Sequence, residues 1–432
     1  MVKISEFAVE RVSPSPSLYN VLTIQQWMDD YENEAKYNLA ETCCASISLD
    51  DLAAFSEKPG SILDFSQKQV YGAIRGSNAL RTNIANLYSD STSESLTAEN
   101  ILVTNGAIQA NFLSLYTNVG PGDHVICHYP TYQQLYSVPE SFGAEVSLWK
   151  SKQEENWRVD LDELKGLIRP NTKVIIIKYA RPHNNPPPNC TDKSNSNPQN
   201  PTGAVLNKEI LQSIVGIARQ YGITIHSDEV YRPLFHSLDD DDQHPPSIMS
   251  FGYDNVVVTG SMSKTFSLAG IRVGWIASRS RDIIERCASV RHYTTISVSQ
   301  VDDQIATAAL STPTVNNLLQ RNIDLARRNL AEVDSFVREF EWAVKWTRPG
   351  AGTTAFIQFV DRAGRPIDDV DFCKRLQAKT GVMLVPGSQC FGGGGDFKGF
   401  VRMGYVPEHQ VVVDGLQALR KFMRDDYERL EG

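Results

Sequence analysis

The chain has few of the residue patterns that build metal sites and disulfide frameworks. Its 432 residues include seven cysteines, an odd number without a CxxC pair, and eight histidines without an HExxH pattern. Zinc sites and small disulfide-rich folds depend on such spacings. We therefore expect free thiols in a reducing compartment and no metal site.

Long apolar runs and an excess of basic residues are also absent. No run of 18 or more apolar residues occurs, and residues 1–6 lack the apolar segment of a secretory signal. The net charge of -9 argues against nucleic acid or an anionic membrane as a main partner, because both require basic surfaces. Hydrophobic residues make up 41% and charged residues 22%, values typical of a soluble globular protein. We expect a cytoplasmic protein with two domains.

The most informative stretch is the run SMSKTFSLAGIRVG, from Ser261 to Gly274. Lys264 follows the apolar run 255–259, which predicts a strand of an open α/β sheet that presents groups to a ligand. Burial beside other cations would lower the pKa of this lysine and free its amine to form a Schiff base. Ser261 and Arg272 suit a phosphate, because a hydroxyl donates a hydrogen bond and a guanidinium binds two oxygens. Together these groups suggest pyridoxal 5′-phosphate.

Two further turns supply groups for the same ligand. Asp228 ends an expected strand, and a carboxylate against a pyridine nitrogen keeps that nitrogen protonated. The run 101–104 predicts another strand, and Gly106 permits a tight turn into a helix. The free N–H groups of Ala107 and Ile108 at the start of that helix form a phosphate site.

An aromatic side chain is expected to stack on the pyridine ring. Tyr132 follows the expected strand 124–128, and a ring placed after a strand end can lie flat on the ligand. Tyr129 and Tyr136 are alternatives for this role.

In their order along the chain, these motifs resemble those of the class I/II aminotransferases, pyridoxal-phosphate-dependent enzymes of fold type I. The resemblance covers residues from about 38 to 430. It implies an α/β fold: a large domain with a mostly parallel seven-stranded sheet, and a small α+β domain. It also implies amino transfer between an amino acid and a 2-oxo acid through a Lys264 aldimine, in a homodimer.

The same resemblance implies three domain segments. Residues 1–50 are an N-terminal segment that joins the small domain, 51–303 form the large cofactor-binding domain, and 304–432 form the small C-terminal domain. The pattern from residue 304 to Glu339 predicts one long helix at the start of the last segment.

The resemblance assigns roles to four more residues. Tyr231 is implied to donate to the cofactor's 3′ oxygen and to act in catalysis with Lys264 and Asp228. Asn200, in Asn-Pro-Thr-Gly, is implied to bind the same oxygen and to lie beside the substrate. Arg402, in Val-Arg-Met-Gly, is implied to bind the substrate α-carboxylate at two points. Tyr71 is implied to reach the cofactor phosphate of the neighbouring subunit.

Two segments have more than one interpretation. Residues 42–46 either line the pocket or form an ordinary surface loop. Residues 181–199 separate the expected strand 173–178 from Asn200, and they hold five prolines and five asparagines without an apolar period. Such a composition favours an exposed loop. It is either a functional insertion or a mis-spliced part of the predicted gene.

The reaction also has two hypotheses. Residues 291–299 and 349–356 are similar to the same regions of capreomycidine-synthase-like enzymes, which cyclise a modified arginine. Transamination is the leading hypothesis, and a pyridoxal-phosphate-dependent cyclase or lyase, acting by ring closure or β/γ-elimination, is the alternative. The fold does not decide between them, and the substrate side chain stays open.

Overall fold

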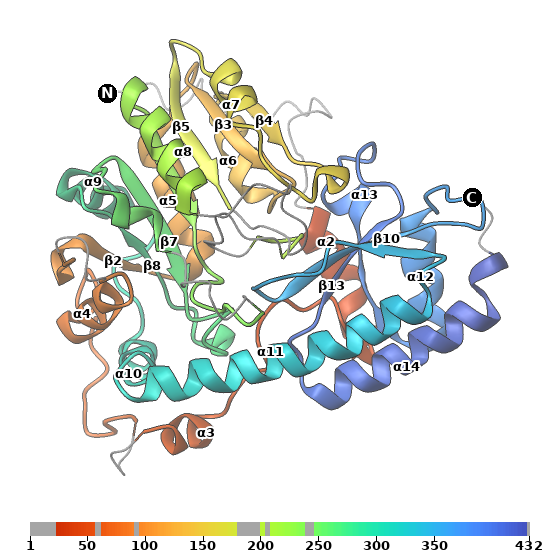
Figure 1. Ribbon diagram of the computed structural model, residues 1–432. Coiled ribbons are helices and arrows are strands. Elements are labelled where there is room, and N and C mark those ends of the chain that lie inside the picture. The colour runs from red at the N-terminus through yellow and green to blue at the C-terminus, as the bar shows by residue number, and fades with distance from the viewer. Residues whose placement is uncertain are drawn as a thin grey trace, which may run out of the picture.

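The computed structural model describes residues 23–56, 62–89, 95–178, 199–203, 208–237 and 246–429. Figure 1 shows two sheet regions with helices around them, and the long helix α11 (Thr314–Glu339) runs beside α14 (His409–Asp425) along one side of the molecule. None of the described helices has both the length and the apolar character that a membrane span requires.

The larger sheet has seven strands in the order β2-β8-β7-β6-β5-β3-β4. β8 runs antiparallel to both of its neighbours, and all the other neighbouring pairs are parallel. The prediction of a mostly parallel seven-stranded sheet is therefore confirmed. The strands are β2 (Ile101–Thr104), β3 (His124–Tyr129), β4 (Glu145–Lys150), β5 (Thr172–Ile177), β6 (Thr224–Asp228), β7 (Val256–Ser261) and β8 (Gly274–Ala277).

Helices cover both faces of this sheet, which explains why its central strands are apolar throughout. On β5, Val174 and Ile176 pack into a cluster with α5 and α6, whereas Ile175 and Ile177 pack into the cluster on the opposite face. The helices of this part are α3 (Leu49–Ala54), α4 (Asn78–Asn86), α5 (Gly106–Asn118), α6 (Gln134–Ser141), α7 (Leu161–Leu167), α8 (Lys208–Tyr221), α9 (Arg281–Arg291) and α10 (Gln300–Ala309).

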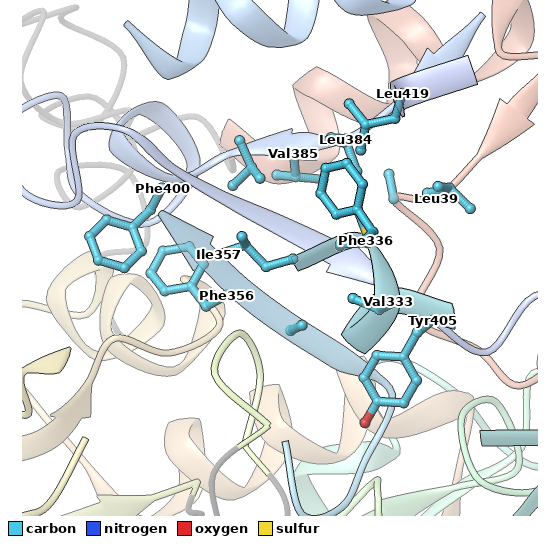
Figure 2. Close-up of a cluster of buried hydrophobic side chains, with 14 of the residues drawn as sticks. Leu39, Val333, Phe336, Phe356, Ile357, Leu384, Val385, Phe400, Tyr405 and Leu419 are labelled. Carbon is cyan, nitrogen blue, oxygen red and sulfur yellow. The ribbon is translucent and has the colours of Figure 1, made fainter. Parts of the chain in front are cut away.

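The smaller sheet is antiparallel and has the strand order β12-β13-β10-β9. Its strands are β9 (Val344–Trp346), β10 (Thr354–Phe359), β12 (Val385–Pro386) and β13 (Phe400–Gly404), and its further helices are α12 (Asp369–Thr380) and α13 (Gly387–Cys390). The N-terminal segment joins this part: β1 (Tyr37–Asn38) pairs with β11 (Val382–Met383), and α2 (Thr23–Tyr31) precedes it. Figure 2 shows Leu39 in one apolar cluster with Phe336 of α11 and Leu419 of α14.

We propose that the boundary between the two domains lies within α11. The core of the larger sheet includes Leu318, whereas the core of the smaller sheet includes Ala326. The sequence-based segments 1–50, 51–303 and 304–432 remain a proposal. The division of the apolar cores favours a second boundary near the middle of α11 in place of residue 304.

The structure corrects two expectations. The helix expected from residue 304 to Glu339 is two helices, α10 and α11, because Pro313 lacks an N–H group and disfavours a helical residue before it. Most of the segment 181–199 lies outside the described residues, but Gln199 is 1% exposed. Its side chain donates to the Pro130 carbonyl at 2.7 Å, so Gln199 belongs to the packed structure and not to an exposed loop.

Candidate active site

A cavity of about 310 Å³ lies at the carboxyl ends of β5, β6 and β7. All the predicted site residues except Tyr71 line it: Ala107, Ile108, Tyr132, Asn200, Asp228, Tyr231, Ser261, Lys264, Arg272 and Arg402. A larger cavity of about 820 Å³ contains none of these residues in its described lining. We therefore place the candidate active site in the smaller cavity.

One end of the cavity is a set of anion-binding groups around Gly106. Helix α5 begins at Gly106, which has a φ of +76°, and the side chain of its N-cap residue, Asn105, makes no capping hydrogen bond. A Cβ atom on Gly106 would lie 2.6 Å from an Nη atom of Arg272, so the guanidinium packs directly against this turn. Arg272 also donates to Ser263 Oγ at 3.3 Å. Backbone N–H groups, a guanidinium and hydroxyls thus converge where the sequence predicts a phosphate.

The other end is built around Asp228, the last residue of β6. Its side chain is 2% exposed, and its Oδ1 accepts a hydrogen bond from the Val230 N–H at 3.2 Å. Its Oδ2 lies 2.8 Å from the Nζ of Lys178 and 3.4 Å from the Nδ2 of Asn111. Burial lowers the pKa of His226, the next partner of Asn111, to about 4. His226 is therefore neutral at pH 7, and Lys178 supplies the positive charge beside Asp228.

Lys264 points into the cavity and contacts the N-terminal segment. Its Nζ donates to Thr42 Oγ1 at 2.5 Å and to Cys43 Sγ at 3.3 Å, and it lies 3.9 Å from Glu41 Oε1. Thr42 and Cys43 line the cavity, so the pocket-lining interpretation of residues 42–46 is confirmed for these two.

The expectation that other cations lower the pKa of Lys264 is wrong. Burial disfavours the charged form of the amine and so acts to lower its pKa. Electrostatic interactions with the acidic groups of Cys43, Tyr231 and Glu41 outweigh this effect, so the pKa of Lys264 is raised. The amine of Lys264 is consequently protonated at neutral pH. It must lose a proton before it can act as a nucleophile or a base.

Arg402 closes the side of the cavity formed by the smaller sheet. It lies on β13, is 4% exposed, and donates to Asn200 Oδ1 at 3.4 Å and to the Ala40 carbonyl at 2.8 Å. Its buried Nε has no partner in the described part of the chain. Because a buried N–H is costly without an acceptor, this atom indicates that an anionic ligand completes the site.

The two predicted tyrosines lie near the Asp228 end. Lys178 Nζ is 5.7 Å from the ring centroid of Tyr132 and 5.2 Å from that of Tyr231. The hydroxyl of Tyr132 accepts a hydrogen bond from Gln25 at 3.0 Å, which anchors this ring to helix α2. Both residues line the cavity, and their roles toward a cofactor remain predictions.

Tyr71 lies outside the cavity and is 76% exposed. Phe65, Val70 and Ile74 are exposed in the same segment. Within a single chain, Tyr71 therefore lies at the surface and does not contribute to the candidate active site of that chain.

Glu41, Asn111 and Lys178 are among the polar residues of the site that sequence reasoning missed. Asn111 lies in the second turn of α5 and Glu41 in an irregular segment, where no local pattern marks them. Lys178 did carry a signal, because it is a charged residue directly after a buried apolar strand. Such a position lies at the carboxyl edge of a parallel sheet, where ligands bind.

The residues present fit pyridoxal 5′-phosphate. The turn at Gly106 suits a phosphate, because α5 begins there and the guanidinium of Arg272 packs against it. Lys264 offers an amine in the same cavity and Asp228 a buried carboxylate. Lys178 is an additional cation that already pairs with that carboxylate.

Comparison with known proteins gives a consistent result. The model of the family "Aminotransferase class I and II" matches residues 43–186 and 195–413, so it leaves out 187–194 within the unusual segment. The chain is similar to the crystal structure of a PLP-dependent aminotransferase from Streptococcus suis, with 36% identity and a TM-score of 0.81. That match covers 96% of this chain and 99% of the other.

Two of the relatives carry different activities in their names. Aspartate aminotransferase of Thermotoga maritima is 28% identical over 81% of this chain and 82% of its own length. Capreomycidine synthase of Streptomyces vinaceus is 26% identical over 66% of this chain and 66% of its own length. The chain is thus similar to a protein named for transamination and to one named for capreomycidine synthesis, the two reactions considered from the sequence.

Proposed function

Because the chain belongs to the aminotransferase class I and II family, we propose that its cavity transfers an amino group between an amino acid and a 2-oxo acid. The protein is a pyridoxal-phosphate-dependent enzyme of the transaminase type. The observation that carries the proposal is the convergence of Lys264, Asp228 and the unpartnered Nε of Arg402 on one cavity.

Arg402 and Asn200 are proposed to bind the α-carboxylate of the substrate. The guanidinium is already held by the Ala40 carbonyl, and its free Nε can donate to a carboxylate oxygen. A planar guanidinium binds a carboxylate at two points, which orients the α-carbon. Because Arg402 is buried, water cannot compete well for the same contact.

Lys264 is proposed to hold the cofactor and then to move a proton at the α-carbon. As the lysine takes up that proton, the hydroxyl of Thr42 is placed to accept a hydrogen bond from the amine. The carboxylate of Glu41 is placed to stabilise the positive charge that the amine gains. Proton transfer by a positioned side chain typically contributes about 10²- to 10⁴-fold to a rate.

Asp228 and the Gly106 turn are proposed to hold the two ends of the cofactor. Pyridoxal phosphate supplies an aldehyde and an electron-accepting ring when bound. Asp228 would hold the proton of the ring nitrogen, and Asn111 keeps the carboxylate oriented. Ala107, Ile108, Ser261 and Arg272 would bind the phosphate, while Tyr132, Tyr231 and Asn200 would contact the ring.

A second reaction has support from one observation, the similarity to capreomycidine synthase. In a cyclase or lyase a leaving group departs from the substrate side chain, whereas in transamination the amino group stays on the cofactor. The products therefore distinguish the two functions without knowledge of the substrate.

The proposed function is tested by a single half-reaction. When stoichiometric enzyme is mixed with a panel of amino acids, we expect about one equivalent of a 2-oxo acid per site from the best donor. Mass spectrometry should find pyridoxamine phosphate on the protein, and a 2-oxo acid should convert it back. Release of a cyclic amino acid, or of ammonia together with a 2-oxo acid, without formation of pyridoxamine phosphate would decide for the second reaction.

We also propose a homodimer in which Tyr71 serves the site of the partner. The segment 65–74 exposes the side chains of Phe65, Val70, Tyr71 and Ile74, and it contacts residues 297–300. Apolar side chains gathered on a surface mark an interaction site, and a second copy is the expected occupant. The cytoplasmic location expected from the sequence stays a prediction.

Hybrid dimers test the role of Tyr71. Co-expression of Tyr71→Ala with Lys264→Ala should restore about a quarter of the wild-type activity, because half of the dimers then contain one intact site. Each variant alone serves as the control and should be far less active. If Tyr71 acted within its own chain, no hybrid site would be intact, and activity would stay at the level of the controls.

A further inference from the structure

Lys178 is a buried cation that none of the roles above uses. It directly follows β5, in which residues 174–177 are all apolar, and it is 4% exposed. A buried ammonium is unfavourable unless an anion or hydrogen-bond acceptors compensate it. The carboxylate of Asp228, 2.8 Å away and 2% exposed, provides that compensation. Lys178 and Asp228 are thus a buried ion pair at the end of the sheet.

This ion pair lies in the candidate active site. Lys178 and Asp228 both line the cavity, and the ammonium lies within 6 Å of the ring centroids of Tyr132 and Tyr231. The proposed function requires the same carboxylate to hold the protonated ring nitrogen of the cofactor. Two cations would then share one carboxylate, and like charges close together disfavour each other's charged form.

We propose that Lys178 is a positioning residue that regulates how tightly, and in which protonation state, the site holds the cofactor ring. In the cofactor-free protein, Lys178 neutralises Asp228 and stabilises the fold. In the loaded protein, it weakens the hold of Asp228 on the protonated ring nitrogen. The inference rests on the proposed function, because it assumes that pyridoxal phosphate occupies this cavity.

The proposal predicts opposite changes in two measurements. Lys178→Met should lower the thermal stability of the cofactor-free protein, because Asp228 becomes a buried charge without a counter-ion. The same change should tighten the binding of pyridoxamine phosphate, which needs no bond to Lys264, by about tenfold or more. Fluorescence titration and a thermal melt measure the two effects.

Two further variants make the experiment decisive. Lys173→Met removes a lysine charge at an exposed position of β5, the strand that precedes Lys178, and should change neither measurement. Lys178→Gln keeps a hydrogen-bond donor for Asp228 without the charge, so it should shift the affinity in the same direction even if the methionine variant folds poorly. If loss of Lys178 lowers stability and also weakens binding, the lysine is an ordinary structural contact and the proposal is wrong.

A ligand without the ring nitrogen identifies the atom that is involved. A 1-deaza analogue of pyridoxamine phosphate has a carbon in place of that nitrogen and cannot use the freed carboxylate. Its binding should not improve in Lys178→Met, so the preference for the natural ring should rise by about tenfold. Equal changes for the two ligands would overturn the inference alone, whereas no binding of either ligand to the wild-type protein would overturn the proposed function.

Discussion

Replacement of Lys264 by alanine is expected to abolish both turnover and the covalent attachment of pyridoxal phosphate. The amine lies in the cavity with Asp228 and Arg402 and is the group proposed to move the α-proton. Loss of both roles should reduce kcat by about 10⁴-fold or more. Borohydride reduction of the wild-type protein, followed by peptide mapping, should place the pyridoxyl label on Lys264.

The cavity offers an internal control for this experiment, because Lys178 is a second lysine in its lining. Lys178 has the carboxylate of Asp228 at 2.8 Å and its side chain is 3% exposed, whereas the side chain of Lys264 is 26% exposed. The label should therefore persist in Lys178→Met and disappear in Lys264→Ala. A label that maps to Lys178 in the wild-type protein would contradict the assignment.

Replacement of Asp228 by asparagine is the second change with a large expected effect. Asparagine keeps the shape but removes the charge that would hold a proton on the ring nitrogen. We expect kcat to fall by about 10³-fold, the scale of removing one preorganised electrostatic contact at a reacting centre. The melting temperature should fall as well, because the buried ammonium of Lys178 loses its partner. Single-turnover kinetics and a thermal melt measure the two effects.

The double variant Asp228→Asn with Lys178→Met separates stability from catalysis. It removes both members of the buried pair, so thermal stability should recover relative to Asp228→Asn while activity stays low.

Activity close to that of the wild type in Asp228→Asn would show that this carboxylate does not serve the reaction, and the proposed mechanism would have to be abandoned.

The local sequence pattern was sufficient to predict the site residues that lie at or just after the end of a strand. Asp228 ends β6, and Lys264 follows the end of β7; their strands are parallel neighbours, with Asp228 opposite Thr259. Parallel strands present their carboxyl ends at one edge, so both groups were expected to face one ligand. Local pattern also predicted the turn at Gly106, whereas the mostly parallel sheet was implied by the family resemblance.

Local pattern failed where a proline or a distant partner decided the outcome. Apolar periodicity joined α10 and α11 into one helix, although Pro313 separates them. The pKa of Lys264 was expected to fall because of neighbouring cations, yet it is raised by groups that include Glu41, 223 residues earlier in the chain. No spacing in the sequence indicates that contact.

The sequence by itself determined the family, the fold class and ten of the residues that line the cavity, because these depend on short motifs and on the periods of strands and helices. Only the tertiary structure decided the charges around those groups. Glu41 lies beside Lys264, and Lys178 pairs with Asp228, because β1 joins β11 and β5 lies beside β6. Electrostatic interactions depend on distance in space and on burial, and neither is encoded by proximity along the chain.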